Sequence, residues 1–308
     1  MKMRFRLAAW ICILAMALSV LSVPVYASAA EASGEDKVAE QSADQETPAA
    51  ASEETTTTAE ETTTAAAVKK GNCDSYIGLS KNWMVLATAK KYVKVYKKKK
   101  TSSKVLGHFS KNNCIEVATK KMKKGTKYTW LPVYLKNHKI GYIQKKKVSL
   151  GKLNIKNFGL DTKGKANAKN RTRVKICKYG LPYIGVRFRL GGTSLTQGID
   201  CSNFVKKSMH NAGVSCHGLA VDLSTQGKKI SRNQLKPGDT LYYYNNPHDL
   251  RIGHSAIYVG GYNMAPGKGY IINASGHQGS IYPSGGLRFS RIDYRKPTAV
   301  RFRNFVGN

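Results

Sequence analysis

Two side chains of this sequence, a cysteine and a histidine, stand in surroundings that suit nucleophilic chemistry. Cys201 precedes a run in which Phe204, Val205 and Met209 recur at helical spacing, which predicts that the cysteine opens a helix. The exposed N–H groups and the positive end of the helix dipole favour a thiolate at such a position. We therefore expect a lowered pKa for Cys201 and a nucleophile near neutral pH.

His254 has the best context of the seven histidines to act as the base that such a nucleophile needs. It opens an apolar run that ends at residue 260, and a turn with glycine and proline separates this run from a second one at 270–274. The pattern predicts an antiparallel hairpin in which His254 faces Asn273. Asn273 would then fix the tautomer of His254 and complete a Cys-His-Asn arrangement.

Each of these residues also has a plainer interpretation. Cys201 could be a buried structural thiol, His254 a half-buried histidine at a strand end, and Asn273 an asparagine before a turn, with His277 four residues on. The sequence has no Cys-x-x-Cys or His-x-x-x-His spacing and no glycine-rich loop with the spacing of a phosphate cradle. We therefore expect no metal and no other cofactor.

The elements that would hold this site lie between residues 171 and 308. A helical stretch at 171–179 and a turn-rich loop at 193–198 precede the helix that Cys201 opens, and the hairpin of His254 follows. Five motifs in this order resemble the NlpC/P60 family of cysteine peptidases. They are Gly-Val-x-Phe-x-x-Gly-Gly, Asp-Cys-Ser, Leu-Lys-Pro-Gly-Asp, Gly-His-Ser-Ala-Ile-Tyr-Val-Gly and Asn-Ala-Ser.

The resemblance covers residues 171–306 and implies a fold and an activity. The implied fold is a papain-like α+β core, in which a helix with the nucleophile packs on an antiparallel sheet with the base. The implied activity is cleavage of peptidoglycan stem peptides between γ-D-glutamate and the diamino acid that follows.

Carried over position by position, the resemblance assigns Cys201 as the nucleophile, His254 as the general base and Asn273 as the third polar residue, where relatives often have histidine. Asp200 and Ser202 match positions that help to hold the free amine and the D-glutamate carboxylate of the stem peptide. Their chemistry agrees, because a carboxylate suits an ammonium group and a hydroxyl suits a carboxylate.

Several positions depart from the family pattern. Phe188 replaces a usual tyrosine, Leu190 a frequent tryptophan and Asn203 a small glycine. These changes bear on which stem peptide is accepted rather than on the nucleophile. Arg187 and Arg189 flank Phe188 and either receive substrate carboxylates or decorate a basic surface, so we include all three among the candidate substrate-binding residues.

Residues 71–150 show a different pattern, which predicts a small all-β barrel and resembles bacterial SH3-type cell-wall domains. Short apolar alternations lie at 92–96, 105–107, 115–117, 130–134 and 140–143. Between residues 68 and 150 there are 22 lysines and no arginine. Lysine point charges favour a diffuse wall polyanion such as teichoic acid over base reading, so we expect no nucleic acid partner. The lysines could also serve solubility alone.

The sequence pattern of the N-terminal part predicts that the protein is exported. Residues 1–27 have a basic start, an apolar stretch and small residues at the end, typical of a cleaved signal peptide, so no membrane span would remain. Residues 28–70 are rich in alanine, threonine and glutamate, which predicts a disordered linker. We expect a second linker at 151–170 and a secreted, extracellular or wall-associated protein.

The remaining cysteines and the choice of reaction stay open from the sequence. Cys73 with Cys114 and Cys177 with Cys216 are the simplest disulfide pairs in an exported protein, and free buried thiols are equally compatible. A thiol and an imidazole also serve a Cys-His amidase or acyltransferase. Outside the enzymes, the alternative is a non-catalytic wall-binding protein with a closed cleft.

Overall fold

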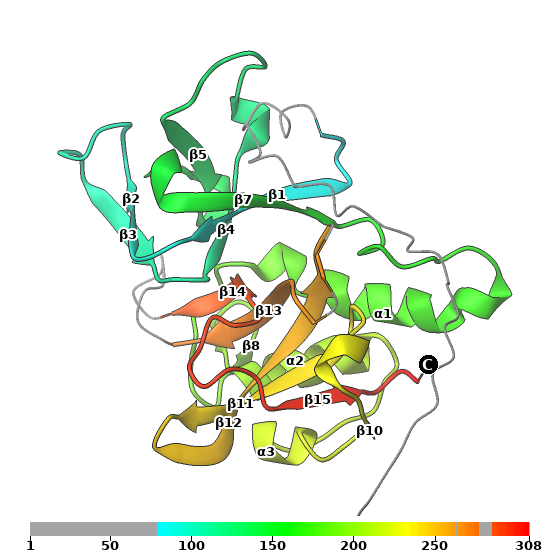
Figure 1. Ribbon diagram of the computed structural model, residues 1–308. Coiled ribbons are helices and arrows are strands. Elements are labelled where there is room, and N and C mark those ends of the chain that lie inside the picture. Colours follow the sequence, from blue (N-terminus) through cyan, green and yellow to red (C-terminus); the bar gives the residue numbers. More distant parts are fainter. Residues whose placement is uncertain (1–78, 263, 266, 277–284, 308) are drawn as a thin grey trace, which may run out of the picture. The chain divides into compact units, whose positions relative to one another are not determined.

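The computed structural model describes residues 79–276 and 285–307, with the exception of 263 and 266. The expected signal peptide at 1–27, the linker at 28–70, Cys73 and His277 lie outside the described residues. The described residues belong to one compact unit, coloured cyan to red in Figure 1. No helix within them is long and apolar enough to cross a membrane.

The first part of this unit is all β, and we call it the β module (residues 83–154). It has two antiparallel sheets, one in the order β4-β1-β7 and one in the order β3-β2-β6-β5. The bounds are Trp83–Ala89 (β1), Val93–Tyr96 (β2), Val105–Phe109 (β3), Cys114–Glu116 (β4), Trp130–Tyr134 (β5), Ile140–Gln144 (β6) and Val148–Asn154 (β7).

The five strands expected from alternation are present as β2 to β6, whereas β1 and β7 were not expected. β1 shows no alternation because both of its faces are covered. Val85 and Ala87 lie in the core of the β module, whereas Met84 and Leu86 lie in the core of the second part. The resemblance of the module to SH3-type domains stays a prediction.

The second part combines helices with a six-stranded antiparallel sheet in the order β10-β15-β11-β12-β13-β14. Its helices are α1 (Ala168–Tyr179), α2 (Cys201–Asn211) and α3 (Ala220–Leu223), and α2 and α3 pack on β12. The sheet strands are Lys228–Lys229 (β10), Thr240–Asn246 (β11), Asp249–Gly260 (β12), Tyr270–Ser275 (β13), Gly286–Arg291 (β14) and Arg301–Asn304 (β15). A short ribbon joins Thr193–Ser194 (β8) to Gly198–Ile199 (β9).

The expected linker at 151–170 is wrong at both ends. Residues 151–154 belong to β7, and α1 begins at Ala168. Between them, the buried side chain of Phe158 packs into the core of the second part. The segment is therefore built into the fold.

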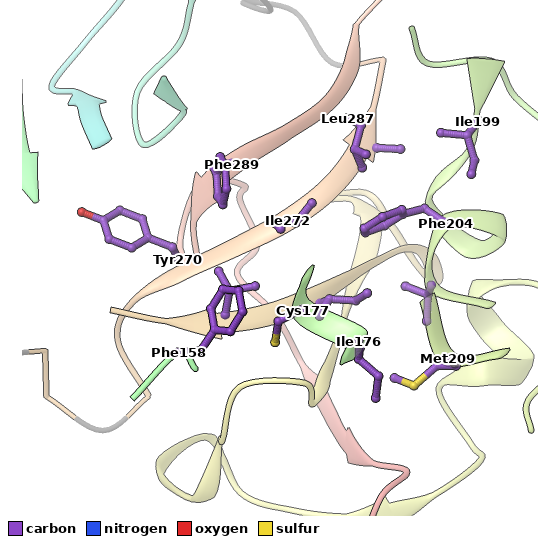
Figure 2. Packing of buried hydrophobic residues seen from close by; sticks show 14 of the residues in the cluster. Phe158, Ile176, Cys177, Ile199, Phe204, Met209, Tyr270, Ile272, Leu287 and Phe289 are labelled. Carbon is purple, nitrogen blue, oxygen red and sulfur yellow. The ribbon is translucent and has the colours of Figure 1, made fainter. Parts of the chain in front are cut away.

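The strands of the second part divide their side chains between two faces. Ile272, Leu287 and Phe289 pack with Phe204 of α2 in the main core (Figure 2). Neighbouring residues in a strand point to opposite faces, so Asn273 lies on the other side of the sheet. That side has its own smaller apolar cluster, which includes Tyr243, Ala256 and Ile271.

The β module and the second part share one interior. Asn113, just before β4, forms an isolated antiparallel bridge with Ser290 of β14. The next strand residue, Arg291, donates its N–H to Asn112 O at 2.6 Å, and Asn112 Nδ2 donates to Asp293 O at 2.8 Å. Together with Met84 and Leu86, these contacts join the two parts along the edge strand β14.

Candidate active site

Cys201 is the first residue of α2, as the spacing predicted. The helix begins here because Asp200 is an N-cap: its carboxylate accepts the Asn203 N–H at 2.7 Å. The apolar side of α2, with Phe204, Val205 and Met209 fully buried, fixes the helix on the sheet. The thiol of Cys201 is buried at the rim of this packing, with 9% of the residue exposed.

The expected lowering of the Cys201 pKa is wrong for a thiol that is buried in this way. Burial raises the pKa of the thiol above its ordinary value, and the Asp200 carboxylate adds to the rise. Hydrogen bonds from the backbone N–H groups of Ser255 and Ser202 oppose this shift without cancelling it. The helix start therefore does not suffice to ionise a thiol that is removed from water, and a base must take its proton.

His254 lies in β12, opposite Tyr243 of β11, and is 3% exposed. The hydrogen bond from Ser255 to the Cys201 thiol comes from the residue directly after His254. The structure thus brings the cysteine and the histidine that the sequence singled out to neighbouring positions. The rings of Tyr243 and Tyr294 flank the imidazole at centroid distances of 5.6 and 6.1 Å.

The hairpin of β12 and β13 exists, but its register differs from the predicted one. Ile257 pairs with Ile272, and continuing that register places Ala256, not His254, opposite Asn273. A bulge between Tyr258 and Gly260 changes the register near the turn. The expected direct pairing of His254 with Asn273 is therefore wrong.

Tyr294 makes the link between these two residues instead. Its hydroxyl lies 2.8 Å from His254 Nε2 and donates to Asn273 Oδ1 at 3.0 Å. Sequence reasoning missed Tyr294, because it lies in a turn after β14 and belongs to none of the quoted motifs. Asn273 is thus connected to His254 through Tyr294 and not by a direct hydrogen bond.

Asp200 and Ser202 lie at the start of α2, and each is 4% exposed. The Ser202 hydroxyl donates to Asp200 Oδ1 at 3.0 Å. Asn203 Nδ2 donates both to Asp200 Oδ2 at 3.0 Å and to Gly192 O at 3.1 Å. The asparagine that replaces the small residue of the family pattern therefore ties the helix start to the glycine turn before it.

Phe188 is also brought to this region, and its two arginine neighbours lie beside β9 as well. Phe188 forms a parallel bridge with Ile199, and a Cβ atom on Gly276 would come within 2.7 Å of its ring. Arg187 and Arg189 are exposed, and Arg187 Nε donates to Gln197 O at 2.5 Å. Phe188 thus lies between β9, which leads into Cys201, and the end of β13.

Among the described residues, the other cysteines are free thiols. Cys177 and Cys216 are not paired with each other: Cys177 Sγ donates to Tyr258 O at 3.6 Å. Cys114 is buried and lies 3.3 Å from Thr88 Oγ1. No group of three or more His, Cys, Asp or Glu side chains in this part of the chain is placed to hold a metal ion.

Comparison with known proteins relates part of the chain to one family. Residues 185–289 match the model of the NlpC/P60 family. The chain is similar to Gamma-DL-glutamyl hydrolase of Bacillus subtilis, with 34% identity over 28% of this chain and 21% of that protein. It is also similar to Murein DD-endopeptidase MepS/Murein LD-carboxypeptidase of Escherichia coli K12, with 34% identity over 39% of this chain and 58% of that protein.

A solved NlpC/p60 domain, that of the peptidoglycan hydrolase SagA, aligns with 43% of this chain and 97% of its own at 25% identity and a TM-score of 0.33. The matched region spans between about a fifth and three fifths of the length of the two curated relatives. The matched residues 185–289 include Cys201, His254 and Asn273, whereas Tyr294 lies beyond them.

Proposed function

We propose that this chain is an exported peptidoglycan hydrolase whose NlpC/P60 domain is a thiol endopeptidase. One observation carries the proposal: the Cys201 thiol at the start of α2 accepts a hydrogen bond from the residue next to His254, and Tyr294 holds Nε2 of that histidine. The names of the relatives support hydrolysis of peptide bonds in murein. We assign the γ-D-glutamyl bond to the diamino acid as the bond that is cleaved.

In the proposed reaction, His254 accepts the proton of the Cys201 thiol as the sulfur attacks the γ-carbonyl carbon of D-glutamate. Burial raises the pKa of the thiol, which disfavours a thiolate formed in advance and is consistent with proton transfer to His254 during the attack. The oxyanion that forms accepts a hydrogen bond from the backbone N–H of Cys201, one of the first N–H groups of the helix. His254 returns the proton to the leaving amine, and the acyl group stays on sulfur as a thioester.

Water completes the cycle. His254 takes a proton from a water molecule, whose oxygen attacks the thioester carbon and releases a γ-D-glutamyl carboxylic acid. The thiolate leaves, and the proton on His254 restores the thiol. Asn273 and Tyr294 hold the imidazole throughout and take no part in bond making.

The substrate side of the site is proposed on the same residues. Asp200 and Ser202 would hold the free amine and the D-glutamate carboxylate of the stem peptide, and Phe188 would form an apolar wall. Arg187 and Arg189 are exposed, and Arg187 donates to Gln197 O, so we propose that they belong to the basic surface, with capture of substrate carboxylates as the alternative. For the lysine-rich β module, we propose attraction to anionic wall polymers such as teichoic acid.

The test is mass spectrometry of muropeptides after incubation of walls with the protein and with Cys201→Ala. Walls with diaminopimelate and walls with lysine at position three rank the substrates. Cys216→Ala removes another buried thiol and serves as the matched control. We expect fragments ending in γ-D-glutamate from the native protein and from Cys216→Ala only.

Other outcomes point to the alternatives. Products cut at another amide bond, again lost in Cys201→Ala, would replace the endopeptidase by a Cys-His amidase or acyltransferase. Unchanged muropeptides on walls that the protein binds would support a non-catalytic wall-binding protein.

A further inference from the structure

We propose that Tyr294, and through it Asn113 of the β module, are positioning residues that set the tautomer of His254. The inference rests on the proposed function in assigning His254 as the base. It goes further, because it gives the β module a part in arranging the catalytic site besides any role in wall attachment.

The contacts form one continuous chain across the two parts of the fold. The Ser290 hydroxyl donates to Asn113 Oδ1 at 2.9 Å, and Asn273 Nδ2 donates to Ser290 Oγ at 3.3 Å. The Tyr294 hydroxyl donates to Asn273 Oδ1 at 3.0 Å and lies 2.8 Å from His254 Nε2. Four hydrogen bonds thus connect a residue of the β module to the imidazole.

The chain has a direction, because each hydroxyl has a single hydrogen to give. Since Asn113 Oδ1 accepts from Ser290, the Ser290 oxygen is left to accept from the Asn273 amide nitrogen. The amide oxygen of Asn273 then accepts from Tyr294, whose hydrogen is used there. Burial raises the pKa of Tyr294, so the phenol keeps that hydrogen. With its hydrogen given to Asn273, the Tyr294 oxygen accepts from its other neighbours, which are the side chains of Ser275 and Arg295 and Nε2 of His254. This places the ring proton of His254 on Nε2.

This tautomer is the productive one. With the proton on Nε2, the lone pair of the neutral ring is on Nδ1, and that nitrogen can take the thiol proton. In the reversed chain, Ser290 would donate to Asn273 Oδ1, and Asn273 Nδ2 would donate to Tyr294. Tyr294 would then donate to Nε2, the ring proton would be on Nδ1, and the base would be disabled.

Burial and anchoring make the direction depend on Asn113. Asn113, Ser290, Asn273 and His254 are each at most 3% exposed, so bulk water offers these four residues no substitute partners, whereas Tyr294 is half-buried. The backbone of Asn113 is fixed by the β module, because its N–H donates to Ser110 O and its carbonyl accepts from Ala89 N–H, both at 3.0 Å. Asn273 Nδ2 also lies 3.5 Å from Arg288 O, a contact too long to orient the amide strongly.

The experiment records the ring nitrogen signals of His254 by ¹⁵N NMR in the full-length protein, together with kcat on purified muropeptides. Tyr294→Phe removes the hydroxyl that accepts from Nε2. Asn113→Leu removes the acceptor at the far end, whereas Asn113→Asp keeps an acceptor that cannot donate when ionised. Asn112→Gly is the matched control: it removes a hydrogen bond between the same two parts, and its φ of 65° suits glycine.

We expect the Nε2–H form in the native protein, in Asn113→Asp and in Asn112→Gly. A mixture of tautomers is expected in Asn113→Leu and in Tyr294→Phe, with kcat lower by about tenfold and about 100-fold respectively. If Asn113→Leu does not fold, Ser290→Ala interrupts the same chain and should give a mixture as well.

Unchanged tautomers in Asn113→Leu and Ser290→Ala would remove the β module from the proposal, and an unchanged tautomer in Tyr294→Phe would overturn it altogether. Equal losses of kcat and of the Nε2–H tautomer in Asn112→Gly and Asn113→Leu would mean that contact between the two parts matters, whereas the direction of the hydrogen-bond chain does not. The NMR result stands even if the native protein cleaves no muropeptide, so failure of the proposed function is recognised separately.

Discussion

Glu116 at the end of β4 gives a prediction that does not depend on the proposed function. Burial raises the pKa of this carboxyl to about 7, and Lys120 opposes the rise. Glu116 lines a cavity of about 510 Å³ between the β module and the second part, where Tyr134 and Arg288 are also present. The charged form of the carboxyl therefore loses hydration, and the attraction of Lys120 offsets this loss only in part.

The size of the effect follows from proton linkage. The ordinary pKa of this group is 4.5, so the folded chain binds its proton more tightly than the unfolded chain. Binding of this proton stabilises the folded chain relative to the unfolded chain. This contribution is fully present below about pH 4 and is lost as the pH rises through about 7. At 1.36 kcal/mol for each tenfold change in the proton equilibrium, the loss is at most about 3 kcal/mol.

The assay is urea unfolding of the full chain at about pH 5 and about pH 8, for the native protein and for Glu116→Gln. The glutamine has the shape of the protonated acid and cannot ionise, so the variant should lack this loss. We expect the free energy of unfolding of the variant to exceed that of the native protein at pH 8 by up to about 3 kcal/mol, and by far less at pH 5. The same pH dependence in both proteins would refute the reasoning.

Two further predictions concern charge elsewhere in the chain. Arg173 is 1% exposed and pairs with Asp239 at 2.6 Å. Asp239→Asn leaves this buried charge without its partner, so it should lower the free energy of unfolding, measured in urea, by about 3–5 kcal/mol. A loss below about 1 kcal/mol would contradict this. Wall binding by the lysine-rich β module should weaken steeply from about 0.01 M to 1 M salt, where the Debye length falls from about 30 to 3 Å; a salt-insensitive isotherm would exclude electrostatic attraction.

The sequence predicted the residues of the site better than their arrangement. Helical spacing located the start of α2 at Cys201, because a buried apolar stripe and an N-cap are local features. The partner of His254 could not be found in this way. A bulge at Gly260 shifts the hairpin register, and Tyr294 reaches the site from a turn 40 residues beyond the histidine.

The same distinction holds for the pKa of Cys201 and for the strands of the β module. A helix start is visible in the sequence, but the burial that raises the thiol pKa arises from tertiary packing. β2 to β6 alternate and were expected, whereas β1 does not alternate because a different core lies against each of its faces. Alternation reveals only strands with one face open to solvent.

The double burial of β1 has a consequence for protein engineering. A chimaera that exchanges the β module by cutting within 155–170 would expose Met84, Leu86 and Leu153 on one fragment, and the sheet and helices they cover on the other. Both fragments would then present apolar surface and tend to aggregate. A new targeting module should instead be joined before residue 79, so that the β module and the second part stay together as one unit.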